Sequence, residues 1–551
     1  MKRSKILALF LALVFLFALQ AGALAVELPS SGDFSGRLVI IHTNDTHGRD
    51  LSGVYTTAAA AQLKDDYASA GADVLLLSAG DAVQGTPLVN FSQGASAIEF
   101  MNAAGYDAMS PGNHEFDWGV SNLKKLAGIA KFPFLAVNII DTGTGKPLFD
   151  ASRVIAVGGR NVGILGIDTP ETATSAHPDK LKGVSFLSGR AMYEAVQKEV
   201  NLLKSRGCDL IIAIGHLGDD DSSAAAGNRS IDLLENVTGI DLFIDGHSHT
   251  EIDGGAITGG TLRVSTGEYL NHIGVVICDG SAYAAGLLNE GDYKGADPKV
   301  LKLLSDKNAE VDSALSTVIG RAEVVLDGAR APGVRTRETN LGDFAADAIL
   351  WGAKDWLGDG AADAVIINGG SIRETIQAGE ISMKTMNMVF PFGNEIATIE
   401  VTGAELLEAL EAACFAAPEP SGAFPQVAGL SFSLHTGYMY ENGVQYPDSP
   451  YYAPARPGLR VRDLKIGGEP VDPAKTYIIA TNDFLAAGGD TYGAFLGKRA
   501  RKTGLTLDDA LTNYTRAVQG GVITALKYGE PARRINIAPS PSSGDKDGSR
   551  H

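Results

Sequence analysis

Residues 37–48 read Arg-Leu-Val-Ile-Ile-His-Thr-Asn-Asp-Thr-His-Gly, an apolar run followed by a polar loop. The first six residues have the length and the β-branched content of a buried strand. Three further runs have the same character, at 73–78, 209–214 and 241–245. Helical stretches alternate with these runs, as at 189–206, where four apolar residues share one face. The alternation predicts an α/β layered domain over residues 36–296.

A second domain is expected after a helix. Asp297 and Pro298 have the residue types of an N-cap and a first helical position, and apolar residues at near-helical spacing follow them. We therefore expect a linking helix over 297–317 and a second α/β or α+β domain over 318–537. The tail, 538–551, is rich in Pro, Ser, Gly and charge and is expected to be disordered.

Polar clusters follow the predicted strands of the first half. They are Asp45-Thr-His47, Gly80-Asp81, Gly112-Asn113-His114-Glu115-Phe116-Asp117, Gly215-His216 and Gly246-His247-Ser248-His249. Five of the ten histidines fall in these clusters. Ligand sites of open α/β sheets lie beyond the carboxyl ends of the strands, which is where these residues are expected.

The residue types of the clusters suit a metal site. Imidazole and carboxylate without thiolate favour Zn, Mn, Fe or similar ions. His247 and His249, two apart on an extended segment, project to the same side. Two ions about 3.5–4 Å apart can clamp a phosphoryl group and activate a water. His114 and Asp117, three apart on a turn, allow a carboxylate to orient an imidazole and favour its protonated form.

The second half carries arginines and aromatics beside Gly-rich loops. These segments are 335–342, 368–373, 390–394 and 482–490. Guanidinium groups match phosphate or carboxylate, and exposed aromatic rings can stack on a flat base. Each loop taken alone is also compatible with a purely structural role.

The ordered clusters resemble the motif set of the calcineurin-like metallophosphoesterases, and with the second half the chain resembles the bacterial 5′-nucleotidase family. The resemblance implies a four-layer α/β sandwich joined by a long helix to a second α/β domain that binds substrate. It implies two divalent metal ions (Zn, Mn, Co or similar) per chain. One ion would be held by Asp45, His47, Asp81 and His249, and the other by Asp81, Asn113, His216 and His247. His114 and Asp117 match the catalytic pair.

The same resemblance assigns the second-half loops to nucleotide binding. By it, Phe392 and Phe484 would sandwich the base, Asn368 would contact the base, Asp490 would bind the ribose hydroxyls, and Arg335 and Arg373 would contact phosphate or carboxylate groups of the ligand. The implied reaction is release of phosphate from nucleoside 5′-monophosphates by a metal-activated water.

The first 25 residues have the pattern of an export signal. A positive start precedes the apolar run 6–19, and Ala23-Leu24-Ala25 offers a cleavage site. We expect a protein exported to the periplasm or the extracellular medium, without a membrane anchor. The three cysteines form no metal-binding pair and are expected to be free thiols.

The net charge limits the expected partners, and several alternative functions remain to be compared. The net charge of −19 argues against a nucleic-acid polymer as partner, and no obligate protein partner is predicted. Enzyme alternatives on the same fold hydrolyse UDP-sugars, nucleoside di- or triphosphates, 2′,3′-cyclic nucleotides or sulfur groups. A non-catalytic nucleotide receptor is disfavoured, because a receptor has no reason to keep the complete ligand set.

Overall fold

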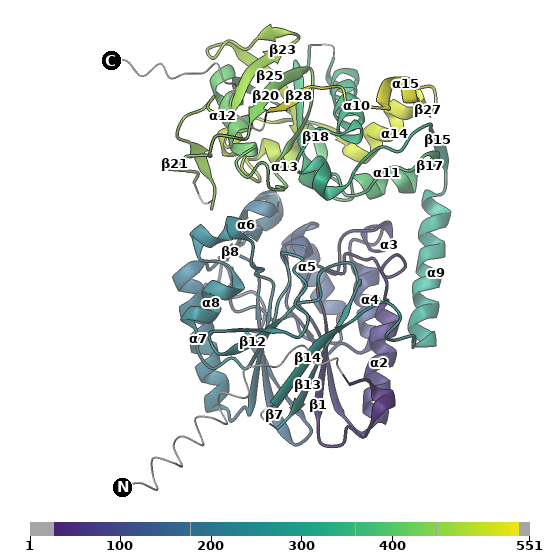
Figure 1. Cartoon of the computed structure of the whole chain (residues 1–551), viewed down its shortest axis with the longest axis vertical. Coiled ribbons are helices and arrows are strands. Elements are labelled where there is room, and N and C mark those ends of the chain that lie inside the picture. Colours follow the sequence, from purple (N-terminus) through teal and green to yellow (C-terminus); the bar gives the residue numbers. More distant parts are fainter. Residues whose placement is uncertain (1–26, 177, 281, 359, 448, 539–551) are drawn as a thin grey trace.

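The computed structural model describes residues 27–538, apart from residues 177, 281, 359 and 448. The predicted export signal and all but the first residue of the predicted tail lie outside this range. Two α/β domains are stacked, and one long helix runs between them along the side of the molecule (Figure 1). Among the described residues, no helix is both long enough and apolar enough to cross a membrane.

The N-terminal domain contains two facing sheets. The first has the order β14-β13-β1-β2-β3, with bounds Ala282–Leu288, Ile273–Asp279, Leu38–Thr43, Asp73–Ser78 and Ala108–Met109. The second has the order β11-β12-β10-β9-β7-β6, with bounds Ala256–Thr258, Thr261–Val264, Leu242–Ile244, Leu210–Gly215, Arg160–Ile167 and Ser152–Val157. Three small strands, β4, β5 and β8, form a separate sheet at Ile139–Asp141, Lys146–Pro147 and Val184–Phe186.

Successive side chains of each strand point to opposite faces of its sheet, and this alternation produces the four layers. Leu38 and Ile40 of β1 pack between the two sheets, whereas Val39 and Ile41 point outward into a core shared with helices. The helices of that outer layer are α2, α4 and α5, at Thr57–Ser69, Ala95–Ala104 and Gly119–Ile129. On the far side, α7 (Gly189–Ser205) and α8 (Ser230–Asn236) cover the second sheet. The buried residues of α7 are the predicted four, Met192, Val196, Val200 and Leu203.

The linking helix α9 spans Pro298–Leu315, and its N-cap is formed as predicted. The Asp297 side chain accepts hydrogen bonds from the backbone N–H groups of Lys299 and Val300. The buried residues are Val300, Leu304 and Val311. Leu301, one of the apolar residues whose near-helical spacing predicted this helix, is 42% exposed.

The C-terminal domain is built on a five-stranded sheet with helices on both faces. Its order is β19-β16-β25-β18-β26, at Pro425–Ala428, Ala364–Asn368, Thr476–Asn482, Glu395–Thr402 and Arg501–Thr506. Helices α10 (Asn340–Leu357) and α14 (Leu507–Ala517) pack on one face, and α12 (Gly403–Ala413) packs on the other. Three smaller sheets accompany it. They are β24-β23-β20-β28 at Glu469–Pro470, Val461–Ile466, Leu430–His435 and Ile535–Ala538, β17-β15-β27 at Gly379–Ser382, Val318–Ala322 and Val522–Ile523, and β21-β22 at Asn442–Gln445 and Tyr452–Pro454.

Candidate functional site

The predicted metal ligands lie at the carboxyl ends of strands from both sheets of the N-terminal domain. Asp45 and His47 follow β1, Asp81 follows β2, Asn113 follows β3, His216 follows β9, and His247 and His249 follow β10. Strands β1, β2 and β3 are parallel, and so are β9 and β10. Parallel strands bring their following loops to one edge of a sheet, and the two facing sheets bring both edges together.

Two groups of side chains have the spacing of metal sites. One contains Asp45, His47 and His249, and the other contains Asp45, Asp81 and His216. Asp81 Oδ2 lies 3.2 Å from His216 Nε2 and 3.8 Å from His47 Nε2. Asp45 Oδ1 lies 3.4 Å from His249 Nε2 and 3.9 Å from His216 Nε2. Both carboxylates therefore lie between imidazoles of the two groups.

Asn113 and His247 lie beside the second group. Nδ1 of His247 is 2.9 Å from Oδ1 of Asn113, and its ring centroid is 5.2 Å from that of His216. The other ring nitrogen, Nε2, is 3.1 Å from Oε2 of Glu171. A carboxylate on the far nitrogen is the usual support of a metal-binding imidazole.

The residues present fit divalent cations. Nε2 of His47 and Nε2 of His216 are buried and have no hydrogen-bond partner among the described residues, which is costly for a polar atom unless a ligand satisfies it. Close glycines keep this space open: a Cβ on Gly112 would lie 2.5 Å from Asp81 Oδ1 and 2.6 Å from His216 Nε2. The backbone is also strained here, because Asp45, His47, Asp81, His247 and His249 all have positive φ. Such strain concentrates at ligand sites.

Glu115, to which the sequence analysis assigned no role, connects the loop after β2 to the loop after β3 through hydrogen bonds. Its buried carboxylate accepts hydrogen bonds from the backbone N–H groups of Asp81, Ala82, Val83 and Gly112, at 2.6–3.3 Å. Burial, together with the nearby charge of Asp81, raises the pKa of Glu115 to about 7. The signal that could have found this role is the position of Glu115 inside the Gly-Asn-His-Glu cluster.

The predicted catalytic pair is in contact. His114 Nδ1 is 2.9 Å from Asp117 Oδ2, and the backbone N–H of His114 donates to Asp81 Oδ1 at 2.9 Å. Burial lowers the pKa of His114, but the carboxylates of Asp117 and Asp81 outweigh burial and hold the pKa above its ordinary value. These two carboxylates therefore favour the protonated form of the imidazole, which lies beside the predicted metal ligands.

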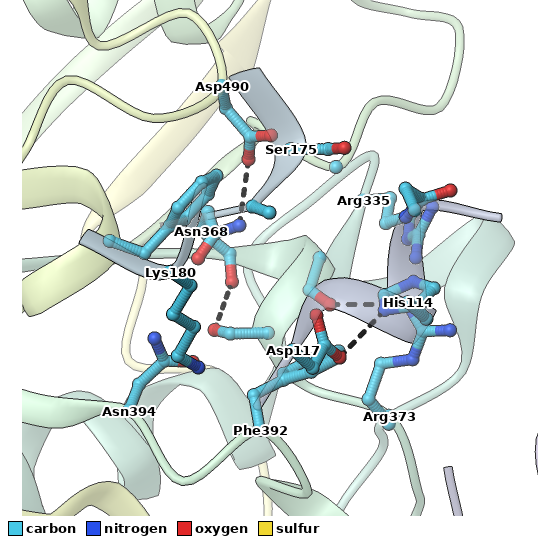
Figure 2. A pocket seen from close by; sticks show the side chains of 16 residues that line it. His114, Asp117, Ser175, Lys180, Arg335, Asn368, Arg373, Phe392, Asn394 and Asp490 are labelled. Atoms are coloured by element: carbon cyan, nitrogen blue, oxygen red, sulfur yellow. Dashed lines mark hydrogen bonds and ion pairs between the residues drawn. The ribbon is translucent and has the colours of Figure 1, made fainter. Parts of the chain in front are cut away.

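One cavity brings the predicted residues of both domains together (Figure 2). Its lining includes His114, Asp117 and Asn113 from the N-terminal domain and all six predicted substrate residues, Arg335, Asn368, Arg373, Phe392, Phe484 and Asp490. Burial, and then the charges of Arg330 and Arg373, lowers the pKa of Arg335 to about 9. Within the described residues, neither Arg335 nor Arg373 forms an ion pair with a carboxylate. This concentration of unpaired positive charge suits an anionic ligand.

A hydrogen-bond chain fixes the amide at the end of β16. Asn482 Nδ2 donates to Asn368 Oδ1 at 3.1 Å, and Asn368 Nδ2 donates to Asp490 Oδ2 at 2.8 Å. Burial raises the pKa of Asp490 to about 6, against the opposing effects of Asn368 and Arg335. The chain orients Asp490 toward the same cavity.

Phe392 packs on the predicted catalytic histidine. The two ring centroids are 5.6 Å apart with an interplanar angle of 17°, and the Arg373 guanidinium lies 5.5 Å from the Phe392 centroid. Phe484 lines the cavity separately, with its ring over Gly489, where a Cβ would lie 2.2 Å from the ring. Because His114 and Phe392 belong to different domains, a relative movement of the domains would change this contact.

Comparison with known proteins identifies both halves. The calcineurin-like phosphoesterase family matches residues 38–251, and the 5′-nucleotidase C-terminal domain family matches residues 318–497. Protein UshA of Escherichia coli is 30% identical over 537 residues, which cover 88% of this chain and 90% of UshA. The chain belongs to the 5′-nucleotidase family. It is therefore a hydrolase of the 5′-nucleotidase type. Its calcineurin-like phosphoesterase domain implies that the enzyme uses divalent metal ions.

Two further relatives show the extent of the match. The 5′-nucleotidase precursor from Thermus thermophilus has a TM-score of 0.75 at 28% identity, and the match covers 92% of this chain and 100% of that one. The trifunctional nucleotide phosphoesterase YfkN of Bacillus subtilis is 31% identical over 512 residues. That match covers 83% of this chain but 32% of YfkN, so the chain spans about a third of this longer relative.

Glu268 is a second residue without a predicted role that contacts a predicted ligand. Its carboxylate lies against Nδ1 of His249, which leaves Nε2 directed toward Asp45. Arg330 of the C-terminal domain places Nη1 3.0 Å from the same Nδ1 and 4.0 Å from Glu268. A neutral Nδ1 cannot both donate and accept, and the nearby carboxylate favours the tautomer with the proton on Nδ1. Arg330 is also within ion-pair distance of Glu268.

Glu268→Gln is expected to weaken metal binding at the His249 group by about 10- to 100-fold, the usual effect of losing such support. The physical reason is that an amide holds the imidazole tautomer less firmly than a carboxylate. Metal titration followed by calorimetry measures the change. The matched control is Glu251→Gln, since Glu251 is 3.3 Å from His272, which is not a predicted ligand, and its side chain is 59% exposed. Equal affinities in both variants would contradict the role of Glu268.

Proposed function

We propose that the enzyme releases phosphate from nucleoside 5′-monophosphates at the cavity between its two domains. The observation that carries the proposal is the lining of this cavity. Arg335 and Arg373, which form no ion pair with any described carboxylate, suit a phosphate. Phe484 and Phe392 offer apolar rings for a base, and His114 lies beside the predicted metal ligands. A nucleotide presents all of these chemical features in one molecule.

The proposed roles follow the chemistry of each group. Asp45, His47, Asp81 and His249 would hold one divalent ion, and Asp81, Asn113, His216 and His247 a second. Two bound ions would neutralise the phosphate oxygens and supply an activated water. His114, kept protonated by Asp117, would stabilise the developing phosphoryl charge or protonate the leaving 5′-oxygen. Phe392 and Phe484 would stack on the base, Asn368 would contact it, and Asp490 would accept from the ribose hydroxyls.

A broader nucleotide hydrolase is the second candidate. YfkN bears the name of a trifunctional nucleotide phosphoesterase, and this chain matches part of it. A cavity that takes a base and a phosphoryl group would also suit UDP-sugars, nucleoside di- and triphosphates or 2′,3′-cyclic nucleotides. Zn, Mn and Co are the metals to be compared.

Phosphate release across a nucleotide panel tests both candidates. The enzyme is first stripped with a chelator and then assayed with each metal added back. We expect the highest kcat/KM on nucleoside 5′-monophosphates and no turnover before metal is restored. Full activity of the stripped enzyme, or a clear preference for another nucleotide class, would overturn the proposal.

Phe484→Ala is expected to raise the KM for nucleoside monophosphates while leaving hydrolysis of a small aryl phosphate unchanged. Base–aromatic stacking is worth about 1–3 kcal/mol, which corresponds to roughly 5- to 150-fold in binding. The aryl phosphate is the matched control, since it has no nucleobase to stack on Phe484. Equal losses on both substrates would indicate a damaged fold instead.

We also propose that the chain is exported. Its first 25 residues combine a positive start, an apolar run of 14 residues and a small-residue cleavage site. N-terminal sequencing of the protein from the periplasm or the medium should give Val26 as the first residue. A chain retained in the cytoplasm and beginning at Met1 would contradict export.

A further inference from the structure

Lys180 faces the same cavity and has no assigned role. It lies in the short 3₁₀ helix η3, Pro178–Leu181, of the N-terminal domain and lines the cavity together with Phe484 and Asn394. Figure 2 shows its side chain pointing toward Asn394. The side chain is half-buried.

The Lys180 ammonium is unpartnered within the part of the chain that the structure describes. Its neighbour Lys182 behaves as an ordinary surface lysine: it is 78% exposed and forms a 2.8 Å ion pair with Asp179. The protein carries 65 acidic and 46 basic residues, so carboxylates that could form an ion pair with a lysine are abundant. An unpaired lysine turned into a cavity therefore points to a partner on the ligand.

The carboxylates that contact the cavity-lining amides Asn394 and Asn368 are already engaged. Asp483 accepts from Asn394 Nδ2 at 3.0 Å and from Lys502 Nζ at 2.8 Å. Asp490 accepts from Asn368. Neither carboxylate is left as a free partner for Lys180, and each is held in place by its own donors.

Lys180 lies away from the phosphate end of the cavity. Figure 2 shows His114, Arg335 and Arg373 on one side and Lys180 and Asn394 on the other. If the phosphate lies beside the arginines, as the proposed function requires, then the base lies beside Lys180. An ammonium only donates hydrogen bonds, so it can only meet an acceptor atom at the edge of that base.

Nucleobases differ in whether one of their exocyclic groups accepts or donates a hydrogen bond. Guanine, hypoxanthine and uracil carry a carbonyl oxygen there, which accepts, whereas adenine and cytosine carry an amino group, which donates. We propose that Lys180 is a specificity-determining residue that makes the enzyme favour nucleotides with an oxo base over those with an amino base. This inference rests on the proposed function for the orientation of the nucleotide.

IMP and AMP test the inference, because their bases differ in the group carried at C6. The wild-type enzyme is expected to favour IMP in kcat/KM by about tenfold or more, the scale of a hydrogen bond to a charged group. Lys180→Met should bring the ratio close to one. Loss of the positive charge also weakens attraction of the phosphate, but equally for both nucleotides, so the ratio cancels that effect. Lys182→Met is the control and should keep the wild-type ratio.

Inosine and adenosine, used as competitive inhibitors of aryl phosphate hydrolysis, give a second measurement. Their inhibition constants report base preference without requiring that a nucleoside monophosphate be a substrate. If the aryl phosphate is cleaved but IMP and AMP are not, the proposed function fails while the nucleoside ratio still tests Lys180. An unchanged ratio in Lys180→Met, or the same change in Lys182→Met, overturns the role of Lys180.

Discussion

Asp81→Asn is expected to lose one of two metal equivalents and to reduce phosphate release by several orders of magnitude. Its Oδ2 lies between the imidazoles of His216 and His47, at 3.2 and 3.8 Å from Nε2. Asparagine keeps the shape but has one oxygen and no charge, so it cannot serve two cations. Loss of a shared ligand removes the paired ions that a phosphoryl transfer needs.

Elemental analysis of the purified variant, beside turnover, measures this effect. Asp107→Asn is a suitable control, since Asp107 comes just before β3 in the same sheet, where it accepts from Lys64 and from the backbone N–H of Leu76. Asp45→Asn is the informative comparison, because Asp45 belongs to both side-chain groups. Two full metal equivalents in Asp81→Asn, together with one in Asp45→Asn, would assign the bridge to Asp45.

The strands and the loops that follow them were predictable, because the sequence patterns that indicate them lie within short stretches of the chain. The predicted strand 73–78 matches β2 in full, and the predicted helix 189–206 matches α7 to within one residue. Hydrophobic periodicity and strand-end polar clusters are properties of short windows of sequence. The resemblance to a family then supplied the four-layer arrangement, which the two facing sheets show.

The supporting residues were not predictable in this way. Glu115 lies inside a recognisable motif, but Glu268 and Lys180 lie beside groups that only tertiary structure brings to them: Glu268 reaches His249 from the loop after β12, and Lys180 faces loops of the other domain. No local pattern distinguishes these charged residues from solvated surface positions. The packing of Phe392 on His114 also depends on how two domains meet, which a single sequence window does not contain.

His114→Ala separates catalysis from metal binding. The His114 side chain contacts Asp117 through Nδ1, whereas Asp81 is held by the backbone N–H of residue 114, which alanine retains. Both metal equivalents should therefore remain. Turnover of nucleoside monophosphates should fall by about 10²–10⁴, the range for loss of a general acid or base.

Substrates with different leaving groups distinguish the two possible roles of His114, general acid and charge stabilisation. The ribose 5′-oxygen is a poor leaving group that benefits from a proton, whereas an activated aryl oxide leaves without one. If His114 is a general acid, His114→Ala should impair nucleotide hydrolysis far more than hydrolysis of an activated aryl phosphate. Equal losses on both substrates would assign it to charge stabilisation, because the phosphoryl oxygens are the same in each. A drop in metal content would contradict both roles and make His114 a ligand.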